Sequence, residues 1–280
     1  VISCLVYSVR MKTLIKLGIS TIILSIASYV IIQVPSVQDR IMVSVVSGMA
    51  NTFGKLTKED ALSVAVCGSR SPIPSPGRAE TCMLVQAGEE MFVVDIGDGS
   101  NANLQNWGID YSKINSVLLT HLHSDHIADL PNLHQGAWIL QSRKDKLKVY
   151  GPEGVAIVTQ GIEMAYGLDY QFRNEHHGDG IAPREYAGFD TRTIDLNNPV
   201  IYQNGALKIT AFKVIHEPIE PSLGYKFEYK GRSLVITGDT SYAQSVIDNA
   251  KDVDVLFHEA QANHMVDILQ NFAAENGAPL

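Results

Sequence analysis

Residues 120–126, with the sequence THLHSDH, constrain this chain more than any other stretch. They follow an apolar run at 117–119, which predicts a buried strand that ends here. Alternate side chains of a strand point the same way, so His121 and His123 should face one point. Asp125 and His126 follow where the chain turns into a helix. Imidazoles and a carboxylate gathered at one strand exit predict a metal site, with Zn²⁺ preferred and Mn²⁺ or Fe as alternatives.

Two later strands also end in a residue that can bind metal. His216 follows the apolar stretch 209–215, and Asp239 follows the stretch 234–238. Either residue alone is more typical of a hydrogen-bonded rim position. Beside the cluster at 121–126, we expect both His216 and Asp239 to be metal ligands.

Composition suits one large globular domain or two small ones. The 280 residues are 45% hydrophobic and 19% charged, with a net charge of −8. Affinity for nucleic acid depends mainly on basic contacts to phosphates, so an acidic chain without a Lys/Arg cluster argues against a nucleic-acid partner without excluding one. Three cysteines are too few for a disulfide scaffold. Cys67 and Cys82 could pair in an oxidising compartment, but we expect two buried thiols.

The N-terminal region predicts export. Residues 1–10 precede Met11 and are interpreted as upstream read-through or vector-derived sequence. Lys12 and Lys16 then lead into an apolar stretch, so residues 11–34 are expected to form a signal peptide or membrane anchor. No A-x-A cleavage motif follows, which favours an uncleaved anchor. The remainder would lie in the periplasm or face the exterior, with residues 35–60 as a linker.

Residues 61–280 alternate short strands and helices. Hairpins are frequent, which argues against a doubly wound parallel sheet and favours an α/β (α+β) fold of four layers, an αββα sandwich. A polar, irregular insertion is expected at 168–200, and its Arg173, His176 and His177 could bind an anionic group or simply form a solvated loop. Strands are expected at 62–69, 114–120, 146–154, 206–216, 223–240 and 252–260, a hairpin at 81–99, and helices at 101–107 and 155–166.

These motifs resemble the metallo-β-lactamase superfamily, in its ribonuclease Z and arylsulfatase-like branch. The resemblance is carried by THLHSDH (120–126), IHEPIEPSLGYKF (215–227) and VITGDT (235–240). It is supported by residues 66–85, VVDIGDGSNANL (93–104) and VYGPEG (149–154), and it runs in order from about residue 62 to 262.

The resemblance implies a dinuclear zinc centre. His121, His123 and His216 would hold the first ion, and Asp125 and His126 the second, with Asp239 bridging. Asp95 would orient a ligand histidine or the motif loop. A hydroxide held by the metals would attack an ester-type bond, and Asp125 would orient it.

The chain departs from the family pattern near its end. The segment FHEAQ (257–261) is present, but the histidine blocks expected after it are not. We therefore expect an incomplete, C-terminally truncated domain whose second metal lacks a ligand. His258 matches a histidine that is not the final ligand, and His264 is expected to lie on a helix surface.

The favoured function is an exported zinc hydrolase of aryl sulfates, phosphodiesters or lactones. A ribonuclease Z-like tRNA 3′ endonuclease and a β-lactamase are the alternatives, and the former would need a basic arm for tRNA that is not visible here. A binding module that has lost catalysis is the alternative from another class. A homodimer is left open.

Overall fold

The computed structural model describes residues 16–22, 24–26, 28–50, 54, 56–73, 75–260 and 263–277. The chain forms two compact units, residues 1–53 and 54–280. The read-through expected at 1–10 and the charged residue Lys12 lie outside the described residues. The second unit begins at Gly54, whose backbone pairs with that of Ile109.

The described part of the first unit is mainly helical. Residues 16–22, 24–26 and 28–32 are in helix, and α2 (Pro35–Ala50) follows a break, so much of the expected linker is a helix. No single described helix meets the length and apolarity needed to cross a bilayer. The bent pair Lys16–Ile32 and Pro35–Val45 meets them only when its two helices are taken together. Cleavage, anchoring and export remain predictions.

Six strands form the first sheet of the second unit, in the order β1-β2-β3-β4-β5-β6. The first three pair antiparallel, whereas β3 to β6 run parallel. Their bounds are β1 Leu62–Gly68, β2 Cys82–Ala87, β3 Glu90–Val94, β4 Ile114–Leu118, β5 Leu147–Gly151 and β6 Phe189–Thr193.

Five strands form the second sheet, in the order β11-β10-β9-β8-β7. All pairs are antiparallel except β10 with β11. The bounds are β7 Val200–Asn204, β8 Leu207–His216, β9 Ile219–Tyr229, β10 Arg232–Ile236 and β11 Val255–Phe257.

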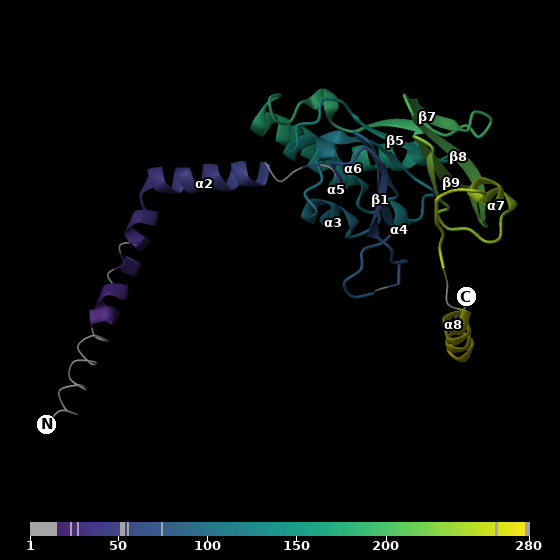
Figure 1. Cartoon of the computed structure of the whole chain (residues 1–280), viewed down its shortest axis with the longest axis horizontal. Helices are drawn as coiled ribbons and strands as arrows, with labels where there is room; N and C mark the ends of the chain where they lie inside the picture. The colour runs from purple at the N-terminus through teal and green to yellow at the C-terminus, as the bar shows by residue number, and fades with distance from the viewer. Residues whose placement is uncertain are drawn as a thin grey trace. The chain divides into compact units, whose positions relative to one another are not determined.

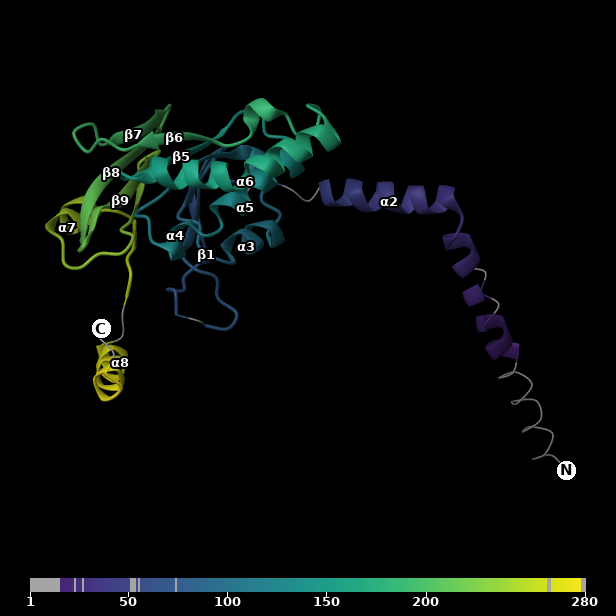
Figure 2. The same cartoon turned by 180° about the vertical axis from the view of Figure 1, so that it is seen from behind.

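The strand side chains divide between two cores by the two-residue period of a strand. Phe92 and Val94 of β3 pack against the second sheet, on residues such as Tyr225 and Phe227. Val93, between them, faces the helices. A third cluster joins the outer face of β8 and β10 to Val246 of α7. The layers are therefore helix, sheet, sheet and helix, as expected (Figures 1 and 2).

Helices α3, α5 and α6 pack on the outer face of the first sheet, and α7 packs on that of the second. Pro131 lies in the first turn of α5, where its missing N–H is not needed. Short 3₁₀ segments occupy Tyr111–Lys113 and Arg184–Tyr186, and a π-helical turn occupies Gly136–Leu140. The remaining bounds are α3 Ser100–Asn106, α4 Ser124–Ile127, α5 Leu130–Gln135, α6 Val155–His177, α7 Gln244–Ala250 and α8 Asn263–Glu275.

The prediction of an irregular insertion at 168–200 is wrong for residues 168–177, because α6 continues to His177. Side chains four residues apart stabilise the extra turns. Arg173 Nε donates to Asp169 Oδ2 over 2.8 Å, and Gln171 Nε2 donates to Glu175 Oε1 over 2.7 Å. The helix ends at Gly178, whose φ of 72° suits glycine.

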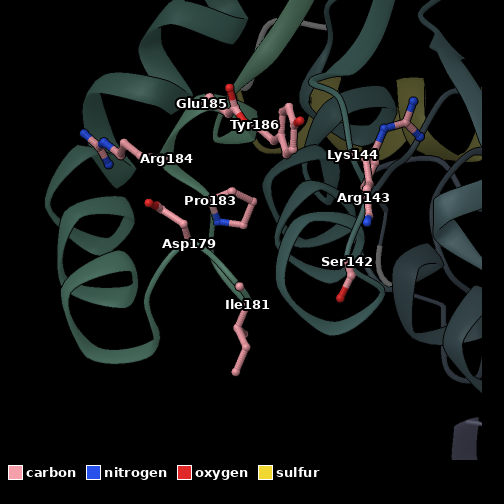
Figure 3. A pocket seen from close by; sticks show the side chains of 10 residues that line it. Ser142, Arg143, Lys144, Asp179, Ile181, Pro183, Arg184, Glu185 and Tyr186 are labelled. Carbon is pink, nitrogen blue, oxygen red and sulfur yellow. The ribbon is translucent and has the colours of Figure 1, made fainter.

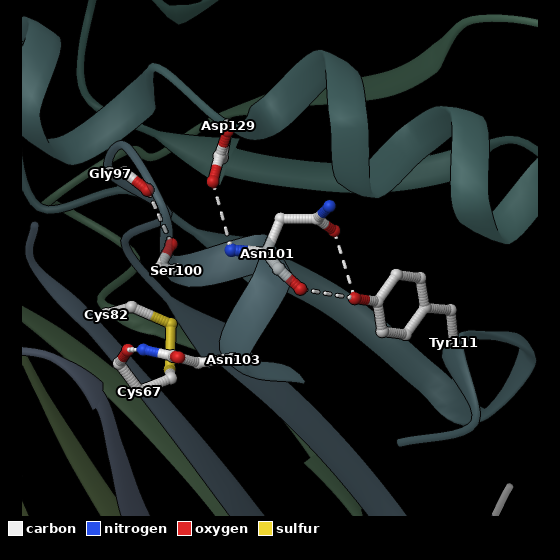
Figure 4. The surroundings of a disulfide bond; sticks show 8 residues. All are labelled: Cys67, Cys82, Gly97, Ser100, Asn101, Asn103, Tyr111 and Asp129. Carbon is white, nitrogen blue, oxygen red and sulfur yellow. Dashed lines mark hydrogen bonds between the residues drawn. A yellow bond between two sulfur atoms is a disulfide. The ribbon is translucent and has the colours of Figure 1, made fainter. Parts of the chain in front are cut away.

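Cys67 and Cys82 form a disulfide, so the prediction of two free thiols is wrong (Figure 4). Strands β1 and β2 are antiparallel neighbours, and an irregularity in their register after Val66 brings Cys67 beside Cys82. The two Cα atoms are 5.0 Å apart, within the range that a disulfide spans. Asn103 Nδ2 of α3 donates to the Cys67 carbonyl over 2.8 Å, which ties the bridge to the helix layer.

Candidate metal centre

Three histidines converge at the edge where β4 and β8 end. His121 and His123 lie in the loop between β4 and α4, and His216 is the last residue of β8. His121 Nε2 lies 2.9 Å from His123 Nδ1, and His216 Nε2 lies 3.4 Å from the same atom. Their ligand atoms all fall within 4.8 Å of one another, a spacing suited to one metal ion.

A second group shares His121 with the first and adds His126 and Asp239. His126 is the third residue of α4, and Asp239 lies in the turn after β10. His126 Nε2 lies 3.5 Å from Asp239 Oδ1 and 3.7 Å from Asp125 Oδ2. The structure therefore brings together all six residues that the sequence predicts as ligands.

Asp95 positions His126 of this second group through its carboxylate. It lies directly after β3 with a φ of 56°, a left-handed conformation that Asp tolerates better than most residues. Its carboxylate accepts hydrogen bonds from the Thr120 N–H over 2.8 Å and from Thr120 Oγ1 over 2.7 Å. It also lies 2.8 Å from His126 Nδ1. With Nδ1 held by Asp95, Nε2 is the His126 nitrogen left to face His121 and Asp239.

Thr120 connects the two sheets, a role that the sequence analysis missed. The Thr120 carbonyl accepts a hydrogen bond from the Leu223 N–H of β9 over 2.9 Å. Gly238 has a φ of 62°, and a Cβ added to it would lie 2.7 Å from Thr120 Cβ. Only glycine lets the Asp239 turn approach this closely.

The donor set fits zinc. His126 Nε2 is buried and has no hydrogen-bond partner, which is costly unless a ligand satisfies it. Burial and the neighbouring His126 lower the pKa of His121 to about 3, which keeps His121 in the neutral form that binds metal. Burial also lowers the pKa of His126, but Asp95 and Asp239 outweigh burial and raise it to about 10. A metal at His126 would therefore displace a proton.

A cavity of about 380 Å³ opens beside the centre, lined by Asp125 and Asp239. Among the described residues that line it, Arg70, which follows β1, is the one that carries a positive charge. Arg70 Nη2 lies 3.2 Å from Glu80 Oε1, and Arg70 Nε donates to the Arg78 carbonyl. His258 and Glu259 line the same cavity from the segment after β11. The sequence singled out His258 but gave no role to Arg70 or Glu259.

The residues predicted to bind substrate lie elsewhere. Arg173 lines a separate pocket with Asn132 and Gln135. His176 and His177 are exposed at the end of α6, and His264 is exposed on α8. A cavity of about 600 Å³, larger than the one at the centre, lies between residues 142–144 and 179–186 (Figure 3). None of its lining residues belongs to the metal groups.

Known proteins resemble this chain in sequence and fold. The family described as Beta-lactamase superfamily domain matches residues 93–271. Ribonuclease Z of Mycobacterium marinum is 32% identical over 213 residues, covering 75% of this chain and 74% of that protein. Ribonuclease Z of Mycobacterium bovis is 34% identical over 204 residues, covering 70% and 69%.

Solved structures share the fold. The short form of human tRNase Z superposes with a TM-score of 0.57 at 22% identity, covering 74% of this chain and 82% of that chain. The metallo-β-lactamase fold protein YhfI from Bacillus subtilis gives a TM-score of 0.52 at 25% identity, covering 71% and 70%.

Proposed function

Because the chain belongs to the β-lactamase superfamily, in its ribonuclease Z-like branch, we propose that it is a zinc-dependent phosphodiesterase that cleaves RNA. The family makes it a metallo-hydrolase, and the substrate is the proposal. The sequence alone favours small esters and argues against nucleic acid. RNA becomes the favoured substrate because the chain is similar to proteins named ribonuclease Z over about three quarters of its length.

His121, His123 and His216 would hold one zinc ion, and His126, Asp239 and Asp125 a second. Bound zinc would supply a Lewis acid and lower the pKa of a water molecule. Asp125 is buried to 5% exposure and lines the cavity, so its carboxylate can accept a hydrogen bond from that water and orient it. Asp95 keeps His126 in the tautomer that presents Nε2.

Arg70 supplies the positive charge of the cavity. Glu80 and Asp98 pair with its guanidinium, and Asp125, Asp239 and Glu259 line the same cavity, so an anionic substrate would be repelled without bound metal. A phosphodiester oxygen beside Arg70 would gain a charge-assisted hydrogen bond. This supports an anionic diester over a neutral ester.

The test compares substrates on the purified full chain loaded with zinc. A tRNA precursor with a 3′ trailer is offered beside bis(p-nitrophenyl) phosphate, p-nitrophenyl sulfate and a lactone. Cleavage of the precursor at its 3′ side, lost in His121→Ala, supports the proposal. Turnover of the sulfate or lactone alone contradicts it, because the centre would then be active on another bond.

A second candidate is an exported hydrolase of small esters, such as aryl sulfates, phosphodiesters or lactones. The disulfide Cys67–Cys82 favours it, because disulfides persist mainly in oxidising compartments. The apolar, exposed residues at 17–34 also support export and membrane attachment. A periplasmic reporter fused after residue 60 should be active, and an inactive fusion would remove this candidate.

A further inference from the structure

A small polar pocket lies among the helices that cover the first sheet. Its volume is about 220 Å³, and it is bounded by α3, α5, α6 and the π-helical turn Gly136–Leu140. Single π-helical turns occur frequently at functional sites. Four carboxamides and one guanidinium line the pocket, from Asn101, Gln105, Asn132, Gln135 and Arg173. None of these residues belongs to the metal groups.

Gln135 has a buried amide oxygen without a partner. Its Nε2 donates to Asp169 Oδ2 over 2.9 Å. Because a carboxylate only accepts, this bond fixes the nitrogen on that side and leaves the oxygen as the open atom. Gln135 Oε1 has no hydrogen-bond partner among the described residues. A buried, unpaired acceptor is costly, so a ligand that fits here presents an N–H or O–H group to it.

Gln105 adds a second amide to the pocket. It is exposed, and a Cβ added to Gly136 would lie 3.9 Å from Gln105 Nε2, which places this amide over the start of the π-helical turn. Within the described part of the chain, neither its oxygen nor its nitrogen is hydrogen-bonded. The side chains of Gln and Asn pair bidentately with the amino group and ring nitrogen of adenine. Gln105 therefore offers both groups that such a base requires.

Arg173 places a guanidinium at the same pocket. Its Nε donates to both carboxylate oxygens of Asp169, over 3.0 and 2.8 Å. This pair fixes the side chain, and the two Nη groups have no partner in the parts of the chain that the structure describes. A planar fork of N–H groups matches the oxygens of a phosphate.

From these groups, we propose that the pocket binds an adenine nucleotide, with the base enclosed and the phosphate at Arg173. The amino group of adenine donates to Gln135 Oε1, and Gln105 pairs with the edge of the base. Ile139 and the exposed Leu140 supply apolar surface for the face of the ring. Pockets that enclose drug-sized ligands measure about 300–1,000 Å³, so this smaller one suits a single base whose ribose and phosphate lie at its mouth.

A free nucleotide and an unpaired adenosine of an RNA strand present the same groups to this pocket. The site also does not depend on the proposed cleavage of RNA, because it shares no residue with the metal groups. Binding is therefore measured without turnover. A chain that binds AMP but cleaves no RNA would retain this site and lose the proposed function.

The first test measures AMP binding by calorimetry on the zinc-loaded full chain in mild detergent. We expect one AMP per chain and the same affinity after chelation, whereas a phosphate held at the metal centre would be released with the ion. Gln105→Leu and Arg173→Ala should each weaken AMP binding about 10-fold, because each removes hydrogen bonds to the ligand. Asn106→Leu on α3 and Arg192→Ala on β6, both exposed and outside the pocket, are the matched controls and should bind AMP normally.

The second test measures how Gln135 distinguishes AMP from IMP. IMP carries an oxygen in place of the amino group, so it should bind the natural chain about 10-fold more weakly than AMP. Gln135→Leu should bind AMP and IMP equally, because the oxygen that recognises the amino group is gone. A purely structural role of Gln135 would lower both affinities and keep their ratio.

Competition with an adenosine tetranucleotide identifies the source of the base. Displacement of AMP by the tetranucleotide at lower concentration than unlabelled AMP supports a site for RNA, and weaker displacement supports a site for the free nucleotide. The proposal is overturned if AMP shows no binding at millimolar concentration or binds only when zinc is present. Equal affinity of the natural chain for AMP, IMP and UMP would also overturn it.

Discussion

Asp95 shows how one residue can organise a metal centre without binding metal. It accepts two hydrogen bonds from Thr120 and contacts His126 Nδ1, and it is almost fully buried. Its carboxylate lies 2.8 Å from His126 Nδ1, which favours a proton on that nitrogen.

We expect Asp95→Asn to weaken zinc binding roughly 10–100-fold, because the amide cannot accept every hydrogen bond that the carboxylate accepts. Asn tolerates the left-handed backbone, so the fold should be retained. Competition with a coloured chelator measures the affinity. Asp248→Asn, on the exposed face of α7, is the control, and an unchanged affinity in Asp95→Asn would contradict this role.

His134 makes stability depend on pH. It is buried, and its Nε2 accepts the Gly188 N–H over 3.0 Å. Burial, with the positive charges of Arg143 and Lys146, lowers its pKa from 6.5 to about 4. Between these values the unfolded chain binds a proton that the folded chain does not. The contribution of His134 to the free energy of unfolding is therefore greatest above pH 6.5 and falls by up to about 3 kcal/mol as pH falls to 4.

Urea unfolding of the metal-free protein across pH 4–7 checks this expectation. His134→Gln keeps an acceptor for Gly188 but does not titrate, so its unfolding energy should depend less on pH. His176→Gln, at an exposed position, should behave like the natural chain. Equal slopes for His134→Gln and the natural chain would show that another group controls acid stability.

The first members of the candidate metal groups could be predicted to lie together because their spacing in the sequence is local. His121, His123, Asp125 and His126 lie within six positions, and the strand period fixes their direction. Arg70 could not be assigned in this way. Its place in the cavity depends on the path of the loop between β1 and β2, which no periodicity encodes.

At the scale of elements, the disulfide closes the loop between β1 and β2 that lines the cavity. The bridge spans a sequence separation of 15 residues. Sequence alone could not decide between thiols and a disulfide, because pairing depends on the register shift after Val66.

We expect reduction of this bridge to lower the free energy of unfolding by about 3 kcal/mol, mainly by freeing the unfolded chain. Urea titrations with and without reductant measure the change. Cys67→Ser with Cys82→Ser should unfold at the same urea concentration in both conditions. A natural chain insensitive to reductant would show that the bridge adds no stability.

Helix α6 shows where pattern reading fails. The polar character of the segment that begins at residue 168 predicts a loop there. The helix persists because Asp169–Arg173 and Gln171–Glu175 pair along its surface, and His176 and His177 suit its negative end. The sandwich itself was predictable, because it follows from hairpins and buried strands.

At the scale of the whole molecule, the candidate metal ligands come from both sheets. His121 and His126 follow β4 of the first sheet, whereas His216 and Asp239 follow β8 and β10 of the second. A bound ion would therefore link the two sheets at one edge.

We expect zinc at 100 times its Kd to raise the free energy of unfolding by about 3 kcal/mol. Thermal unfolding with and without zinc measures this gain. His216→Ala removes a candidate ligand on the second sheet and should lose much of this gain in unfolding free energy. His176→Ala should keep the full gain. An equal gain in His216→Ala would show that the ion does not join the sheets.

This arrangement also ties the lifetime of the protein to its metal supply. Without an ion, the edge that carries the ligands can open more often, and local opening is what exposes a backbone to proteases. Chains that acquire metal late should be cleaved first, in the turns that carry His216 and Asp239. The surviving population would then consist mainly of chains that already hold the ion.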